Sequence, residues 1–336
     1  MHVPDHLMND PTELIAGATA AAAVAVTVLG ARRREPAGSE PEHRRTLLAE
    51  PERSSAVVAT AGLVFALQMV NFPVLSGTSG HLLGGALATA LIGPRRALIA
   101  LVAVVASQAM FFGDGGVGAL GVDLWLIALL PVGVAAAVEH LGRTWAGSRG
   151  AASTRLALAG LAALIAPAVA SLAFTGFLAA GGPSGAGTAQ VAGRMLGVHL
   201  AIGLGEAAIT LAVLGAVAAV QRFAPGRGST VGTIWGIALC CGAALSTVAS
   251  AAPDGLERVA DDLGSAVEGP GSILSAGPLQ DYAVRGLEGA AAVAAAGVIG
   301  LLLTGTVAAV ALSAVRLTPT PVLAGRGWVD VPDVSS

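Results

Sequence analysis

The stretch RLALAGLAALIAPAVASLAFTGFLA, residues 155–179, carries no charged side chain after Arg155. About 20 apolar residues let a helix cross the ~30 Å hydrocarbon layer of a bilayer, so this stretch predicts a transmembrane helix. Of all residues in the chain, 54% are hydrophobic and only 12% are charged, which is typical of membrane proteins rather than soluble ones. Further apolar runs lie at residues 12–30, 55–75, 97–112, 117–139, 195–220, 231–250 and 288–315.

A shorter apolar segment lies between His81 and Gly93. The 11 residues between them, 82–92, are too few to cross a bilayer unaided. The segment is therefore either tilted and extended by its glycine-rich approach, or partly re-entrant. With this segment counted, the sequence predicts an all-α membrane protein, a polytopic helix bundle of about nine transmembrane helices in the cell membrane.

The arginines predict how this bundle is oriented. The chain has no lysine, so its 18 positive side chains are all arginines. Cytoplasmic loops retain positive charge, and nine crossings with the amino terminus outside leave only Arg194, Arg258 and Arg285 in outside loops. If the short segment did not cross, the arginines would no longer be concentrated in the inside loops. We therefore expect the short segment to cross and the amino terminus to lie outside. The absence of lysine also excludes a P-loop, so any ATP hydrolysis must occur on another polypeptide.

The chain begins Met1-His2, which offers three linked nitrogens: the amine of Met1, the amide of His2 and the His2 imidazole. Together they can close a five-membered and a six-membered chelate ring around one metal ion. A planar set of nitrogen donors suits Ni(II) or Cu(II), and a fourth nitrogen would complete the square. A solvent-exposed terminal tail is the alternative interpretation.

A candidate fourth nitrogen follows the second predicted helix, in the segment NFPVLSGTSGH from Asn71 to His81. Glycines on both sides of Thr78 and Ser79 let the backbone approach a ligand closely. The predicted topology puts this connection on the same side as Met1. We expect His81 at the start of the short helix, as a metal ligand or, alternatively, as a helix cap or hydrogen-bond donor.

A later predicted helix carries His199 and Glu206, seven residues apart. At 3.6 residues per turn they share a helix face but lie about 10 Å apart along the axis. They can therefore line one cavity without touching, which favours supporting roles such as orienting an imidazole or holding a loop. A proton relay or a buried helix–helix hydrogen bond are the alternatives.

These motifs, in this order along the chain, resemble those of the CbiM/NikM family. Its members are the substrate-binding membrane components of energy-coupling-factor (ECF) transporters for cobalt and nickel. The resemblance covers residues 1–225 and implies a seven-helix metal-binding domain. It implies Met1, His2 and His81 as metal ligands. The residues that carry it are Met1-His2-Val3-Pro4-Asp5, Gln68 to Val74, Gly77 to Leu82, Gly93-Pro94, Phe112 to Gly116, and His199 to Glu206. Supporting roles would fall to Asn71, His199 and Glu206.

The remainder, residues 226–336, resembles the PDGLE (NikN-like) domain, with two transmembrane helices and an outside loop. The resemblance rests on Pro253-Asp254-Gly255-Leu256-Glu257 and Pro278-Leu279-Gln280-Asp281-Tyr282. Six acidic residues in this loop could gather cations, or the loop could simply be solvated. Two positions depart from the family pattern, His6 where glycine is usual and Asp123 where we expect asparagine.

The resemblance implies a transporter subunit rather than an enzyme, which takes up Ni²⁺ or Co²⁺ for cobalamin synthesis or nickel enzymes. It implies no permanently bound cofactor and no nucleic-acid partner. The implied partners are the lipid bilayer, a transmembrane coupling (T) component and cytoplasmic ATPase (A) components. A proton-coupled secondary carrier is one alternative. An intramembrane metalloenzyme using His199 and Glu206 is another, although the chain has no His-Glu-x-x-His signature.

Overall fold

Helices dominate the computed structural model, which describes residues 2–5, 7–30, 53–74, 77–146, 152–182, 187–223, 230–262 and 277–315. The longer ones are α1 (Asp10–Gly30), α2 (Arg53–Gln68), α4 (Pro94–Ser107), α6 (Leu130–Ala146), α7 (Ala152–Gly181), α8 (Thr188–Phe223), α9 (Thr230–Ala243) and α11 (Gly289–Val315). Shorter ones are α3 (Gly85–Ile92), η5 (Gln108–Phe112), α5 (Leu120–Asp123), η6 (Leu124–Leu129), η7 (Leu245–Val248), α10 (Gly255–Asp262) and η8 (Gln280–Tyr282).

Seven helical stretches among the described residues are long and apolar enough to cross a membrane. They correspond to α1, α4 with η5, α5 through α6, α7, α8, α9 with η7, and α11. The apolar part of α2, Ser54–Gln68, is shorter, and α3 has eight residues. The prediction of an all-α polytopic membrane protein is confirmed. The count of nine crossings and the outside amino terminus stay predictions.

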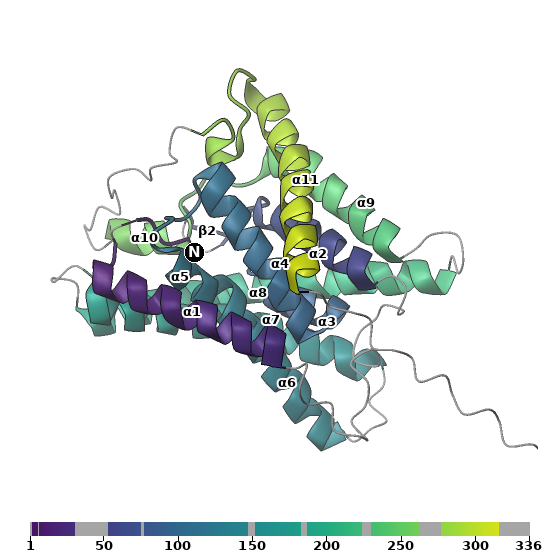
Figure 1. Cartoon of the computed structure of the whole chain (residues 1–336), viewed down its shortest axis with the longest axis horizontal. Helices are drawn as coiled ribbons and strands as arrows, with labels where there is room; N and C mark the ends of the chain where they lie inside the picture. Colours follow the sequence, from purple (N-terminus) through teal and green to yellow (C-terminus); the bar gives the residue numbers. More distant parts are fainter. Residues whose placement is uncertain are drawn as a thin grey trace, which may run out of the picture.

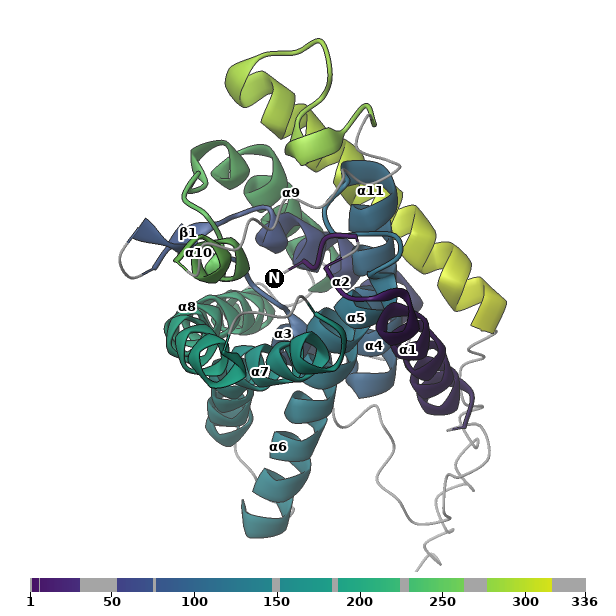
Figure 2. The same ribbon diagram turned by 90° about the vertical axis from the view of Figure 1, so that its left-hand side faces the viewer.

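The helices form two groups around the short helix α3 (Figures 1 and 2). In one group, α2 contacts α4, α9 and α11; in the other, α7 packs along α6 and α8. Helix α1 lies against α5 and η6. Helix α3 contacts members of both groups, and all of its residues except Ala90 are buried. Protein therefore surrounds this helix, which explains how a segment too short to cross a bilayer is accommodated.

Glycine and proline set both ends of α3. Gly84, which precedes the helix, has φ 84°, and Gly93, which ends it, has φ 79°. Glycine adopts such positive φ angles without a steric penalty from Cβ. Pro94 then begins α4, where its missing N–H costs no helical hydrogen bond. The chain therefore changes direction sharply at both ends of α3. The turn before the helix brings the preceding segment into the interior of the bundle.

That preceding segment is not helical. It contains the antiparallel strands β1 (Phe72–Pro73) and β2 (Ser79–Gly80), paired with Phe72 opposite Gly80. His81 follows β2 directly, four residues before α3 begins at Gly85. The expectation of His81 at the start of the short helix was therefore wrong, because the chain turns at Gly84, with φ 84°, and the helix begins only after it. His81 lies on extended backbone instead.

Gly85 offers a direct test of this packing. A Cβ at Gly85 would collide with the Pro131 side chain and lie 2.7 Å from the Pro131 carbonyl carbon. We expect Gly85→Ala to destabilise the protein by about 1–3 kcal/mol, because the backbone of α6 must shift. The unfolding midpoint in detergent measures this. Gly133→Ala in α6 is the control, since nothing lies within 4 Å of its added Cβ. Equal midpoints for the two variants would contradict the packing described here.

Candidate metal centre

The structure brings the His2 and His81 side chains together, although 79 positions separate them in the sequence. Their rings stack with centroids 5.3 Å apart and planes 23° apart. Both side chains are buried, each with about 8% of its surface exposed. Met1 and His6 lie outside the described residues. Two of the three predicted metal ligands are thus neighbours in a protected position.

Both ring nitrogens of His2 have partners. Nδ1 lies 3.1 Å from Oδ1 of Asp114, and Nε2 lies 3.2 Å from Oε1 of Gln108. The next backbone amide, that of Val3, donates to Oδ1 of Asp123 at 2.8 Å. Burial lowers the pKa of His2, and the charge of Asp114 opposes this shift. The His2 ring is therefore held in its neutral form, the form that binds metals.

His81 is held through the backbone that follows it. Glu206 on α8 accepts hydrogen bonds from the amides of Leu83 (3.0 Å) and Gly84 (3.1 Å). Gln68 donates to the Leu83 carbonyl at 3.0 Å. Burial lowers the pKa of His81 to about 3. His81 therefore also presents a neutral imidazole, on a segment fixed from two sides.

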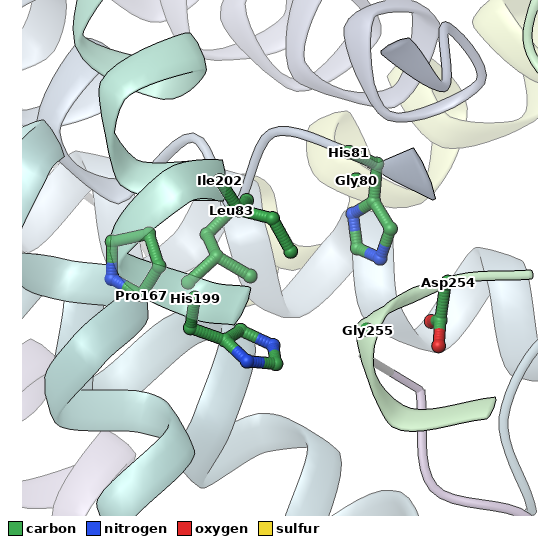
Figure 3. A pocket seen from close by; sticks show the side chains of 8 residues that line it. All are labelled: Gly80, His81, Leu83, Pro167, His199, Ile202, Asp254 and Gly255. Atoms are coloured by element: carbon green, nitrogen blue, oxygen red, sulfur yellow. The ribbon is translucent and has the colours of Figure 1, made fainter. Parts of the chain in front are cut away.

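His199 and Glu206 lie at different places in this arrangement. His199 Nδ1 lies 2.8 Å from the Met195 carbonyl, within its own helix, and the ring is buried. His199 lines a cavity of about 10 Å³. This volume has room for about one water molecule. Its lining residues are Gly80, His81, Leu83, Pro167, His199, Ile202, Asp254 and Gly255 (Figure 3). Glu206 holds the neighbouring loop and does not line this cavity.

Asn71, the remaining predicted supporting residue, contributes through its backbone. Its carbonyl accepts a hydrogen bond from the Ser250 amide at 2.8 Å. Asn71 is partly buried and precedes β1. It therefore fixes the beginning of the non-helical segment that carries His81, rather than meeting the two imidazoles.

Two further residues reach this centre that were not predicted as site residues, Gln108 and Tyr282. Gln108 is fully buried at the start of η5, and its amide also donates to Oε1 of Gln68 at 2.8 Å, so it joins His2 to α2. The sequence did indicate Gln108, because a polar residue inside an apolar helix is a functional candidate. Tyr282 donates its hydroxyl proton to Oδ2 of Asp114, 168 positions away, which no local pattern indicates.

The donors available at this centre are mainly nitrogens. Among the described residues, no three His, Cys, Asp or Glu side chains are arranged to hold a metal ion. Two neutral imidazoles alone make an incomplete site for a first-row transition metal. The amine of Met1 and the amide of His2 are the backbone nitrogens that would complete the predicted set. A mixed backbone and imidazole chelate with Met1 stays a prediction, and the described residues contribute its two imidazoles.

Two family models match the chain. Residues 2–224 match CbiM, described as a cobalt uptake substrate-specific transmembrane region. Residues 229–317 match the PDGLE domain. The resemblance identified from sequence motifs is thereby confirmed for both parts of the chain.

Individual relatives agree with these matches. A putative metal transport protein of Haloquadratum walsbyi is 36% identical over 66% of this chain and 91% of its own length. A putative fused nickel transport protein of Archaeoglobus fulgidus is 31% identical over 72% of this chain and 80% of its own. A crystal structure of a transition metal transporter superposes with a TM-score of 0.54 at 20% identity, covering 68% of this chain and 96% of that one. This last likeness supports the fold alone.

Replacing Glu206 tests how the His81 segment is held. We expect Glu206→Ala to leave the Leu83 and Gly84 amides without acceptors, at a cost of about 1–3 kcal/mol for each buried group. Hydrogen exchange at these two amides should accelerate by roughly tenfold or more. Glu288→Ala, at an exposed position, is the control. Unchanged exchange in Glu206→Ala would show that other contacts hold the segment.

Proposed function

The chain belongs to the CbiM family, with a PDGLE domain after it, and on this premise we propose that it captures Ni²⁺ or Co²⁺ from outside the cell with Met1, His2 and His81. It is a multi-pass protein of the cell membrane and a component of a cobalt or nickel transporter. We assign residues 1–225 to the metal-binding domain and residues 226–336 to the PDGLE domain.

The observation that carries this proposal is the buried pair of neutral imidazoles, His2 against His81 with ring centroids 5.3 Å apart. An imidazole ligates a metal through a deprotonated nitrogen, so a ring kept neutral by burial binds without first losing a proton. The amine and amide next to His2 would supply the remaining two nitrogens. A divalent ion bound by the in-plane nitrogens of both rings would then meet four nitrogen donors.

Binding would rearrange the contacts of His2. The chelate uses Nδ1, so the metal would take the place that Asp114 now occupies at 3.1 Å. Nε2 would then carry the proton and donate to Gln108, which lies 3.2 Å away. Outer hydrogen bonds of this kind orient a ligating imidazole and fix its tautomer. Asn71, His199 and Glu206 would support the site from further out.

Nickel is the metal that we favour. A compact planar set of nitrogen donors suits Ni(II) among the divalent ions. Relatives described as fused nickel transport proteins include those of Archaeoglobus fulgidus and Rhodobacter capsulatus, the second 39% identical over 32% of this chain. Competition between Ni²⁺ and Co²⁺ for the purified protein tests this preference.

The energy for uptake would come from other polypeptides. Without lysine the chain has no P-loop, so we propose a separate transmembrane coupling component and cytoplasmic ATPases. The binding subunit would reorient to release the metal inside. Uptake should stop when the ATPase partners are absent and persist when only the proton gradient is collapsed. The reverse result would indicate a proton-coupled secondary carrier.

His81→Ala tests the site itself. We expect loss of high-affinity Ni²⁺ binding and uptake, because three donors cannot complete the square. Isothermal titration of the purified protein and a cellular uptake assay measure the two effects. His140→Ala, at an exposed position on α6, is the matched control and should behave as wild type.

An added residue before Met1 is the companion change. It converts the terminal amine into an amide and should also abolish binding. Full Ni²⁺ binding and uptake in either altered protein would overturn the assignment.

A further inference from the structure

The PDG turn, Pro253 to Gly255, lies against the segment that carries His81. The Ser79 amide donates to the Pro253 carbonyl at 2.8 Å, and the Ser79 hydroxyl donates to the Ala252 carbonyl at 2.7 Å. Ser79 itself is completely buried. The C-terminal domain therefore pairs, backbone to backbone, with the strand immediately before the candidate ligand.

Gly255 brings the same turn against α8. An added Cβ there would lie 2.9 Å from Cε1 of His199 and 3.1 Å from Cγ1 of Val198. The next residue, Leu256, is buried in the apolar cluster that also contains Val3 and Met195. The PDGLE motif thus packs on three parts of the metal-binding domain: the His81 segment, α8 and the amino-terminal segment.

Asp254 projects from this turn into the cavity shared by His81 and His199 (Figure 3). Its Oδ1 accepts hydrogen bonds from the amides of Leu256 (2.7 Å) and Glu257 (2.9 Å). Glu257 in return accepts from the Asp254 amide at 2.9 Å, which completes a capping box at the start of α10. The carboxylate is therefore held in one orientation, at the edge of the candidate metal centre.

Asp254 carries a negative charge in this position. The same charge acts on the imidazoles of His2 and His81. Both candidate imidazole ligands therefore lie within the field of one carboxylate from the C-terminal domain.

A second contact joins the two domains at the other imidazole. Tyr282, in η8, donates its hydroxyl proton to Asp114, whose other oxygen faces His2. The Tyr282 ring also stacks on Phe112, with centroids 5.0 Å apart. The C-terminal domain therefore reaches His2 through Asp114 and reaches His81 through the PDG turn.

We propose that the PDG turn completes the metal site and that Asp254 strengthens binding of a divalent cation through its charge, without coordinating the ion. This inference rests on the proposed function. Three of the four proposed donors, the amine and the two imidazoles, carry no negative charge, and moving a divalent ion out of water beside them is costly. A fixed carboxylate beside the site offsets part of this cost. Oδ1 is already bonded to two amides of α10, which holds the carboxylate in place as a fixed charge.

Asp254→Asn in the full chain removes the charge and keeps an acceptor for the two α10 amides. We expect Ni²⁺ affinity to fall by about tenfold or more, as for other groups that support a metal without ligating it. The visible absorption spectrum of bound nickel should stay unchanged, because the ligands are the same. Titration calorimetry, absorption and the unfolding midpoint are measured on one preparation.

Asp281→Asn is the matched control. It removes one negative charge from an exposed position in the same domain. Asp281 has φ 54°, a left-handed conformation that asparagine tolerates as well as aspartate. Its Ni²⁺ affinity should equal that of the wild type.

Unchanged affinity in Asp254→Asn would overturn the inference, and so would reduced affinity with a changed nickel spectrum, since Asp254 would then be a ligand. If Asp254→Asn does not fold, Gly255→Ala decides. It keeps the carboxylate but pushes the turn away from His199, so affinity should again fall, and wild-type affinity would refute the inference. His81→Ala in the same titration separates the two proposals: if it binds Ni²⁺ normally the proposed function fails, whatever Asp254→Asn does.

Discussion

The structure depends on satisfying the backbone polar groups of one non-helical segment inside a membrane protein. Buried backbone N–H and C=O groups are tolerated only where protein or water supplies their hydrogen bonds. The segment around His81 receives them from three sources: the β1–β2 pair, the carboxylate of Glu206, and the carbonyls of the PDG turn. Because each partner comes from a different part of the chain, the conformation of His81 follows from the packing of the whole bundle.

Enclosure by protein also accounts for the chemistry expected at the centre. His2 and His81 are neutral because burial disfavours their charged forms. Burial alone would also disfavour a divalent cation, so the two carboxylates nearby matter. Asp114 faces His2 from the metal-binding domain, and Asp254 faces the cavity of His81 from the C-terminal domain. Each domain thus places one carboxylate near one of the two imidazoles.

The sequence predicted most of the helices, because long apolar runs determine transmembrane segments almost by themselves. It also singled out His2 and His81, since a terminal chelate and a glycine-rich loop are local patterns. The predicted start of α3 at His81 was wrong, because the chain turns at Gly84 and the helix begins only at Gly85. Gln108 was overlooked among apolar neighbours, although its polarity was a usable signal. The contacts of Tyr282 with Asp114 and of Pro253 with Ser79 join residues more than 160 positions apart, and only tertiary packing determines them.

The central claim is that one metal ion binds to four nitrogens, two of them imidazoles. X-ray absorption spectroscopy of the purified, nickel-loaded protein tests it most directly, since it reports donor type and imidazole number together. We expect four nitrogen donors, with the scattering signature of two imidazole rings. Coordination dominated by water oxygens or sulfur, or a signal from fewer than two imidazoles, would contradict it.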